Sequence, residues 1–177
     1  MKKLTYILFA SVMILTGCTE DFDINDNVQD INAEFIPGKY VAFNAPGANT
    51  TLDPEEAAED DGSVEFEVEV PTGSVSDVTV NYSLSGTAVF GTDYTIAGAS
   101  GAGGSVVITH DPDAPDAADL IDHADLVVDL LTDGVADGDK TLTITLVSAS
   151  SADGEILVGR AGSDILTSAV VNIADID

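Results

Sequence analysis

Acidic side chains dominate the residues of this chain that could do chemistry. The 177-residue sequence holds 32 Asp and Glu against five Lys and Arg, which gives a formal net charge of −27 at pH 7. Ca²⁺ prefers six to eight oxygen ligands, mostly carboxylates and carbonyls, so acidic loops that converge predict a calcium site. The same charge argues against nucleic acid or an anionic lipid surface as a partner. The acids gather in turn-rich segments at 45–62, 111–125, 133–139 and 174–177.

Other kinds of site have weaker support. His110 and His123 lie in or beside the acidic loop 111–125, where they could bind a transition metal or act as bases. Exposed loop histidines are the simpler interpretation, because no nucleophile has a recognisable setting in the sequence. Carboxylate pairs occur by chance in so acidic a chain, and an EF-hand starting at Asp133 would place Val135 and Ile144 at ligand positions. We therefore expect no enzyme.

The elements that must position the acids are short strands. In the segment Ser63–Val70, apolar residues at every second position alternate with Glu65, Glu67 and Glu69, which is the period of a strand with one buried face. About seven such strands separated by turn-rich loops, with no convincing helix, predict an all-β, two-sheet antiparallel immunoglobulin-like sandwich. A sandwich gathers its loops at its two ends, so acids distant in sequence can converge there. The predicted strands are 39–44, Ser63–Val70, 78–84, 105–109, 126–131, 141–147 and 167–173, with an edge hairpin at 155–158.

The N-terminus resembles the lipobox of bacterial lipoproteins. Lys2 and Lys3 precede an apolar run at 4–15, and Leu15-Thr16-Gly17-Cys18 follows, with Cys18 the only cysteine of the chain. The resemblance implies cleavage before Cys18, which then carries a diacylglycerol and an amide-linked acyl chain such as palmitate. An ordinary secretory signal that ends near a cysteine is the alternative. We expect a signal peptide at 1–17, an acidic tether at 18–38 and one domain at 39–177.

This anchor predicts a place in the cell. A doubly or triply acylated cysteine holds a protein firmly on a membrane without spanning it, so the membrane is a partner through Cys18. We expect the cell envelope, with the outer membrane as the compartment. Glu20, Asp21 and Asp23 resemble the surface-export signals of some Gram-negative lipoproteins, which would put the protein on the cell surface. A solvated linker is the alternative interpretation of these acids.

The stretch 78–96, VTVNYSLSGTAVFGTDYTI, resembles a known family. Gly86-Thr87-Ala88 and Gly91-Thr92-Asp93-Tyr94 are similar to the "GTA…G.DY" string of the Calx-beta domain. That domain is the calcium-binding β-sandwich module of sodium–calcium exchangers, integrin β chains and many bacterial surface proteins. The resemblance covers most of 39–177 and implies a Calx-beta-like sandwich.

The resemblance also implies a set of calcium ligands. Segment 59–62, Glu-Asp-Asp-Gly, is similar to the family's "E-D-G-G" before the second strand, and so implies Glu59 as a ligand. Asp93 matches the aspartate of "DY". The C-terminal VNIADID is similar to "V-x-I-x-D-D-D", which implies Asp175 and Asp177.

Two residues depart from the family pattern. Ile176 stands where the middle aspartate of the terminal run is expected. Lys140 replaces the glutamate of the family's "D-E-T-F", and a lysine there could supply the positive charge that a cation would otherwise bring. Two hypotheses follow. The first is a lipid-anchored, non-catalytic module that binds Ca²⁺ and acts in adhesion or surface assembly. The second is a metal-free structural or partner-binding lipoprotein with a protein or glycan partner, for example an accessory to polysaccharide capture.

Overall fold

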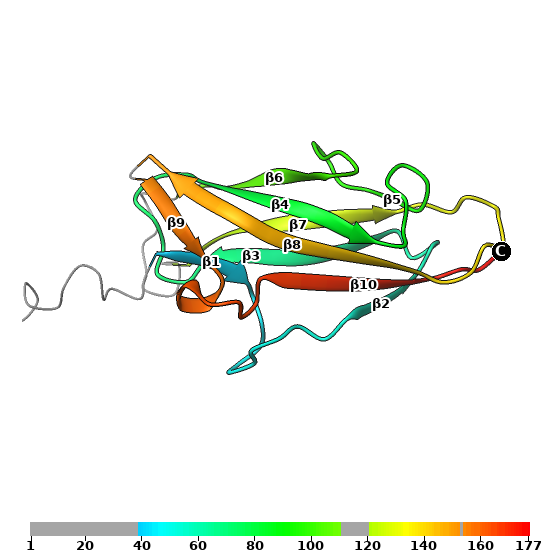
Figure 1. Ribbon diagram of the computed structural model, residues 1–177, viewed down its shortest axis with the longest axis horizontal. Coiled ribbons are helices and arrows are strands. Elements are labelled where there is room, and N and C mark those ends of the chain that lie inside the picture. The colour runs from blue at the N-terminus through cyan, green and yellow to red at the C-terminus, as the bar shows by residue number, and fades with distance from the viewer. Residues whose placement is uncertain (1–38, 111–120, 153) are drawn as a thin grey trace, which may run out of the picture. The chain divides into compact units, whose positions relative to one another are not determined.

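The computed structural model describes residues 39–110, 121–152 and 154–177, which build an all-β unit (Figure 1). The predicted signal peptide, the predicted tether and Cys18 lie outside the described residues. Among the residues that are described, no helix is long and apolar enough to cross a membrane. In chain order the elements are β1 (Tyr40–Phe43), β2 (Glu55–Ala58), β3 (Ser63–Val70), β4 (Val78–Gly86), β5 (Tyr94–Thr95), β6 (Gly103–Ile108), β7 (Asp122–Leu130), β8 (Lys140–Ser151), β9 (Gly154–Val158), the 3₁₀ turn η3 (Arg160–Gly162) and β10 (Ser168–Ala174).

The strands form two layers, which confirms the predicted immunoglobulin-like sandwich. One layer has the order β1-β3-β7-β5. In the other, β6, β4, β8, β10 and β2 follow one another. The pairs β2–β10 and β1–β9 are parallel, although the remaining pairs are antiparallel. β9, which lies in the predicted edge hairpin, pairs with β8 of one layer and with β1 of the other. Its hydrogen bonds therefore connect the two layers.

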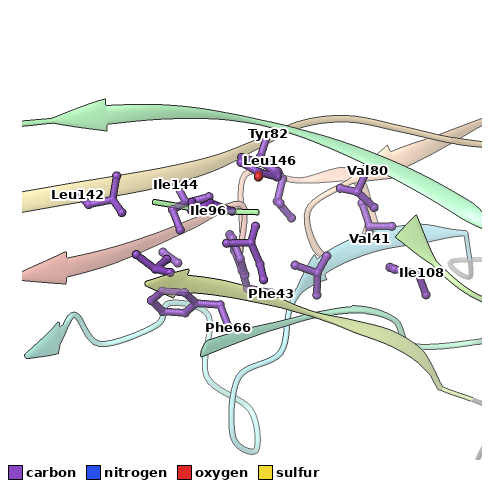
Figure 2. Close-up of a cluster of buried hydrophobic side chains, with 14 of the residues drawn as sticks. Val41, Phe43, Phe66, Val80, Tyr82, Ile96, Ile108, Leu142, Ile144 and Leu146 are labelled. Atoms are coloured by element: carbon purple, nitrogen blue, oxygen red, sulfur yellow. The ribbon is translucent and has the colours of Figure 1, made fainter. Parts of the chain in front are cut away.

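The core lies between the layers, and β3 shows why. Phe66, Val68 and Val70 are at most 5% exposed, as the alternation predicted, whereas Val64 is half-buried. The ring of Phe66 meets the ring of Phe43 from β1 edge to face, with centroids 6.0 Å apart and planes at 67° (Figure 2). Burying apolar area of this kind is the main favourable term in folding such a domain.

A β-bulge explains why the eighth strand is longer than its pattern predicts. Leu142, Ile144 and Leu146 point into the core at a period of two, and the next buried residue is Ala149. The pairing with β4 shifts at this place, so that Val147 is an extra residue and is exposed. A bulge reverses the phase of the alternation beyond it. The predicted strand therefore ended at 147, whereas β8 continues to Ser151.

Other elements also differ from the predictions. The loop predicted at 45–62 contains the short strand β2, whose acidic sequence has no apolar alternation. Tyr94–Thr95 forms β5, which is too short to show a period. β7 begins at Asp122, so His123 lies on a strand and not in the predicted loop 111–125.

Candidate metal centre

Three chain segments meet at one end of the sandwich. Glu59 follows β2, the loop 131–139 joins β7 to β8, and the C-terminal residues follow β10 (Figure 1). Because β2 and β10 run parallel and side by side, their ends lie together, and the Glu59 amide donates to the Ala174 carbonyl at 3.3 Å. The Thr132 hydroxyl donates to the Glu59 carbonyl at 3.4 Å. Pairing of the strands thus brings together residues that are far apart in sequence.

Three carboxylates converge at this end. One oxygen each from Glu59, Asp133 and Asp177 lies within 4.8 Å of the other two. Glu59 is only 2% exposed, Asp133 is half-buried and Asp177 is exposed. The Glu59 Oε2 atom is buried and has no hydrogen-bond partner among the described residues. A buried oxygen of this kind is costly unless a cation or a donor satisfies it.

The electrostatics of the cluster also favour a bound cation. Burial raises the pKa of Glu59, and the negative charges of Asp175, Asp133, Asp177 and Asp137 raise it further. Four neighbouring carboxylates therefore oppose the ionisation of Glu59. A divalent cation at this place would replace repulsion by attraction.

The carboxylate of Asp175 lies outside the group of three converging carboxylates. Its Oδ2 accepts the Gly138 amide at 2.5 Å and its Oδ1 accepts the Asp177 amide at 3.0 Å. The amides of Asp177 and Gly138 lower the pKa of Asp175, since they stabilise its ionised form. Its own amide donates to Asp139 Oδ1 at 3.2 Å. Asp175 thus ties the C-terminal segment to the loop 131–139 and orients both.

Asp93 belongs to the loop between β4 and β5. It is 1% exposed, and its Oδ2 accepts the Val89 amide at 2.5 Å, which closes the loop on itself. Its carbonyl accepts the Leu131 amide at 2.9 Å, so its backbone contacts the start of the loop that carries Asp133. The structure thus places Asp93 at the same end of the sandwich, outside the group of three converging carboxylates.

The Gly-Thr-Ala segment holds this loop against β8. Gly86 has φ +124°, and a Cβ on it would lie 2.1 Å from the Thr141 carbonyl oxygen. That carbonyl accepts the amides of Thr87 and Ala88 at 2.9 and 3.0 Å. The Thr141 amide in turn donates to Thr87 Oγ1 at 2.9 Å. Only glycine permits so close an approach, which gives the sequence pattern a physical cause.

Lys140 does not neutralise the three carboxylates. Its Nζ lies 2.9 Å from Asp137 Oδ2, and within the described part of the chain this is its one ion pair. It also donates to the Asp137 carbonyl at 3.2 Å. The hydrogen bond to the Asp137 side chain is the main cause that raises the pKa of Lys140. Ile176, the other departure, is 48% exposed and fills no place in the cluster.

Sequence reasoning identified the acidic turn 133–139 but did not select Asp133. One signal was present: Asp133 stands three residues after the last inward residue of β7, Leu130, as Glu59 stands directly after β2. An acid just beyond a strand end lies where loops gather. Which of the five acids at 133–139 and 175–177 point to Glu59 depends on side-chain directions that no local pattern contains.

The two histidines lie outside this centre. His110 Nδ1 is 3.6 Å from Asp122 Oδ2, where β6 ends and β7 begins. Asp122 Oδ2 also accepts the Ser74 amide at 2.6 Å and the Ser74 hydroxyl at 3.0 Å. His123 is exposed on β7 opposite Glu69. Among the described residues, neither histidine belongs to a group of three possible metal ligands.

Comparison with known proteins identifies the fold of this chain. No protein-family model and no curated protein sequence matches the chain. The apo-form Calx CBD1 domain is similar in structure, with TM-score 0.50 and 20% identity over 78% of this chain and 97% of that one. The Calx CBD2 domain has TM-score 0.52 and 18% identity over 77% and 86%. CBD12 from CALX1.2 has TM-score 0.50 and 21% identity over 77% and 44%. The chain therefore shares the Calx-beta-like sandwich fold.

Proposed function

We propose that this protein is a non-catalytic β-sandwich module that binds Ca²⁺ through Glu59, Asp133 and Asp177. The observation that carries the proposal is the buried Oε2 of Glu59, which has no hydrogen-bond partner in the described structure and faces two further carboxylates within 4.8 Å. Such a group is expected to be protonated or bound to a cation at neutral pH. The likeness of the fold to Calx CBD domains supports the second possibility.

The donor set favours calcium over other metals. All three side chains offer oxygen, which suits Ca²⁺ and Mg²⁺ and suits the softer transition metals poorly. The residues come from three irregular segments, and Asp177 is exposed. Ca²⁺ tolerates flexible coordination by many oxygens and keeps some water, whereas Mg²⁺ requires a near-ideal octahedron. Calcium is therefore the metal that this arrangement fits best.

Thermal unfolding with added cations tests the proposal. Calcium at 100 times its Kd should add about 2.7 kcal/mol to the free energy of unfolding if the unfolded chain does not bind it. Glu59→Gln and Asp133→Asn should each remove this gain. Asp60→Asn is the matched control, because it removes one exposed charge beside Glu59 without entering the cluster.

Magnesium and monovalent salt must be measured in parallel, because any cation screens a net charge of −27. Equal stabilisation by calcium and magnesium, unchanged in Glu59→Gln, would refute the metal site. The protein would then be a metal-free module that binds a partner. The lysine at 140, which brings a positive charge to this end of the sandwich, is the feature that favours this second function.

We infer from the sequence that this module is held on a membrane of the cell envelope by lipid on Cys18, and that it acts in adhesion or surface assembly with a protein or glycan partner. The lipobox-like string at 15–18 supports this placement. Cys18→Ala should leave the chain unprocessed or release it from membranes in a fractionation experiment. Normal processing together with unchanged membrane partitioning would show that Cys18 is not the anchor.

A further inference from the structure

Charge is distributed very unevenly over the two layers. Segments 78–92, 96–109 and 141–152 contain no Asp, Glu, Lys, Arg or His, in a chain of which 21% of residues are charged. These segments include β4, β6 and nearly all of β8, which are neighbours in one layer in the order β6-β4-β8. In the other layer, β3 and β7 carry Glu65, Glu67, Glu69, Asp125 and Asp129. The β6-β4-β8 part of one layer is thus almost free of charge, whereas β3 and β7 of the other layer are acidic.

β6 is the edge of this uncharged part of the layer. Among the described strands it pairs only with β4. Proteins usually protect sheet edges by charges, proline, bulges or short strands, because an open edge is a template for another chain. Here β2 is four residues long and carries Glu55 and Glu56, and β5 has two residues. β6 has six residues, Gly-Gly-Ser-Val-Val-Ile, and has none of these protections.

The hydrogen-bond pattern shows which backbone groups of β6 point away from β4. The Leu84 amide donates to the Ala102 carbonyl at 3.3 Å, and this sets the phase of the antiparallel ladder. Every second residue from Ala102 onward therefore points its N–H and C=O toward β4. The residues between them point outward. Gly103 uses its outward groups in a turn with Ser100, at 3.0 and 2.9 Å. Within residues 39–110, 121–152 and 154–177, this leaves Ser105 and Val107 as the open positions of β6.

We propose that β6 pairs antiparallel with β6 of a second copy of this chain, across a two-fold axis at Val106. Ser105 then lies opposite Val107 of the second copy, and the outward N–H and C=O groups of both residues are satisfied. Such a contact is self-complementary, as a two-fold interface must be. The half-exposed side chain of Val107 is covered by the same contact.

The distribution of charge favours a second copy of this chain as the partner of this edge. Two chains of −27 repel each other through most of their surface, and repulsion is weakest where neither carries charge. Pairing through β6 joins the uncharged strands β6 and β4 of the two copies edge to edge. The acids of β7 belong to the other layer, where Asp125 lines a hollow together with Ser105 and Val106. It follows that raising the ionic strength should strengthen association.

Sedimentation velocity of the full chain in a density-matched neutral detergent measures the dimer. Val107→Pro removes an outward N–H and leaves the bonds to β4 in place. It should raise the dimer dissociation constant by roughly tenfold or more, because each dimer loses two interchain hydrogen bonds. Val107→Thr keeps the N–H and should dimerise like the parent chain. Val107→Glu keeps the N–H but adds a like charge, and should weaken the dimer most at low salt, whether or not the proline variant folds.

Cross-linking locates the contact. In a Cys18→Ala background, Ser105→Cys with Val107→Cys should form interchain disulfides, since each cysteine lies opposite one of the second copy. Thr143→Cys with Thr145→Cys has the same spacing on β8, an interior strand, and should not cross-link. The proposal is overturned if the chain is monomeric at high micromolar concentration, even if it binds an extended peptide. It is also overturned if all three Val107 variants dimerise like the parent, or if the Thr143 and Thr145 pair cross-links instead.

Discussion

Gly86 offers a test of how the end of the sandwich that holds Glu59, Asp133 and Asp177 is assembled. Its φ of +124° is unfavourable for any residue with a side chain, and its Cβ position lies 2.1 Å from the Thr141 oxygen and 2.9 Å from the Thr141 carbonyl carbon. Both neighbours are backbone atoms and cannot rotate away. Gly86→Ala must therefore push β4 and β8 apart where the loop 87–93 begins.

The cost has two parts. A non-glycine residue in a sparsely populated backbone region costs about 1–3 kcal/mol. Overpacking against a rigid neighbour adds about 1–3 kcal/mol. The free energy of unfolding should thus fall by roughly 2–6 kcal/mol. Gly91→Ala is the control, since its φ is +81° but no atom lies within 4 Å of its Cβ position. That variant should lose only the conformational part, roughly 1–2 kcal/mol.

Urea denaturation followed by circular dichroism measures both variants. Gly86→Ala should have the lower midpoint, and its calcium-dependent stabilisation should be weakened because the loops of that end are displaced. Equal midpoints for the two variants would show that the close approach to Thr141 is not what requires glycine. A midpoint for Gly86→Ala equal to that of the parent chain would mean that neither backbone strain nor the Thr141 carbonyl accounts for the Gly-Thr-Ala segment.

Two further predictions concern the core and the acidic cluster. Phe66→Ala should cost about 3–5 kcal/mol, because it leaves a cavity beside Phe43. Glu67→Ala on the outer face loses only an exposed hydrogen bond from Asn44 and should cost about 1 kcal/mol or less. Equal losses in denaturation would mean that the register of β3 is wrong. The pKa of Glu59 is raised above 4.5 in the folded state, so the folded chain takes up this proton more readily than the unfolded chain. Without metal, the free energy of unfolding should therefore rise as pH falls from neutral through the raised pKa. Glu59→Gln should lack this part of the rise. Identical profiles of stability against pH for the two chains would show that the pKa of Glu59 is not raised by folding.

The alternation of apolar and polar residues predicts those strands that have the core on one face and water on the other. β3 has core on one side and water on the other, so its alternation is complete and its inward residues were predicted correctly. The pattern failed where a strand is short, as in β5, or acidic, as in β2, because pairing with a neighbour holds such segments in place. It also failed at Val147, since a bulge restarts the period and makes the continuation resemble a loop.

Sequence by itself determined the all-β fold, the inward faces of the long strands and the acidic character of the loops, because these depend on the order of apolar, polar and turn-forming residues along the chain. Tertiary structure alone decided which acids converge. Glu59 and Asp133 are 74 residues apart, and they meet because β2 pairs with β10 while the loop after β7 lies against both. Asp175 and Asp93 carry carboxylates too, yet their oxygens accept backbone amides instead. The direction of a side chain at a strand end is set by the packing of three segments, and that packing exists only in the folded chain.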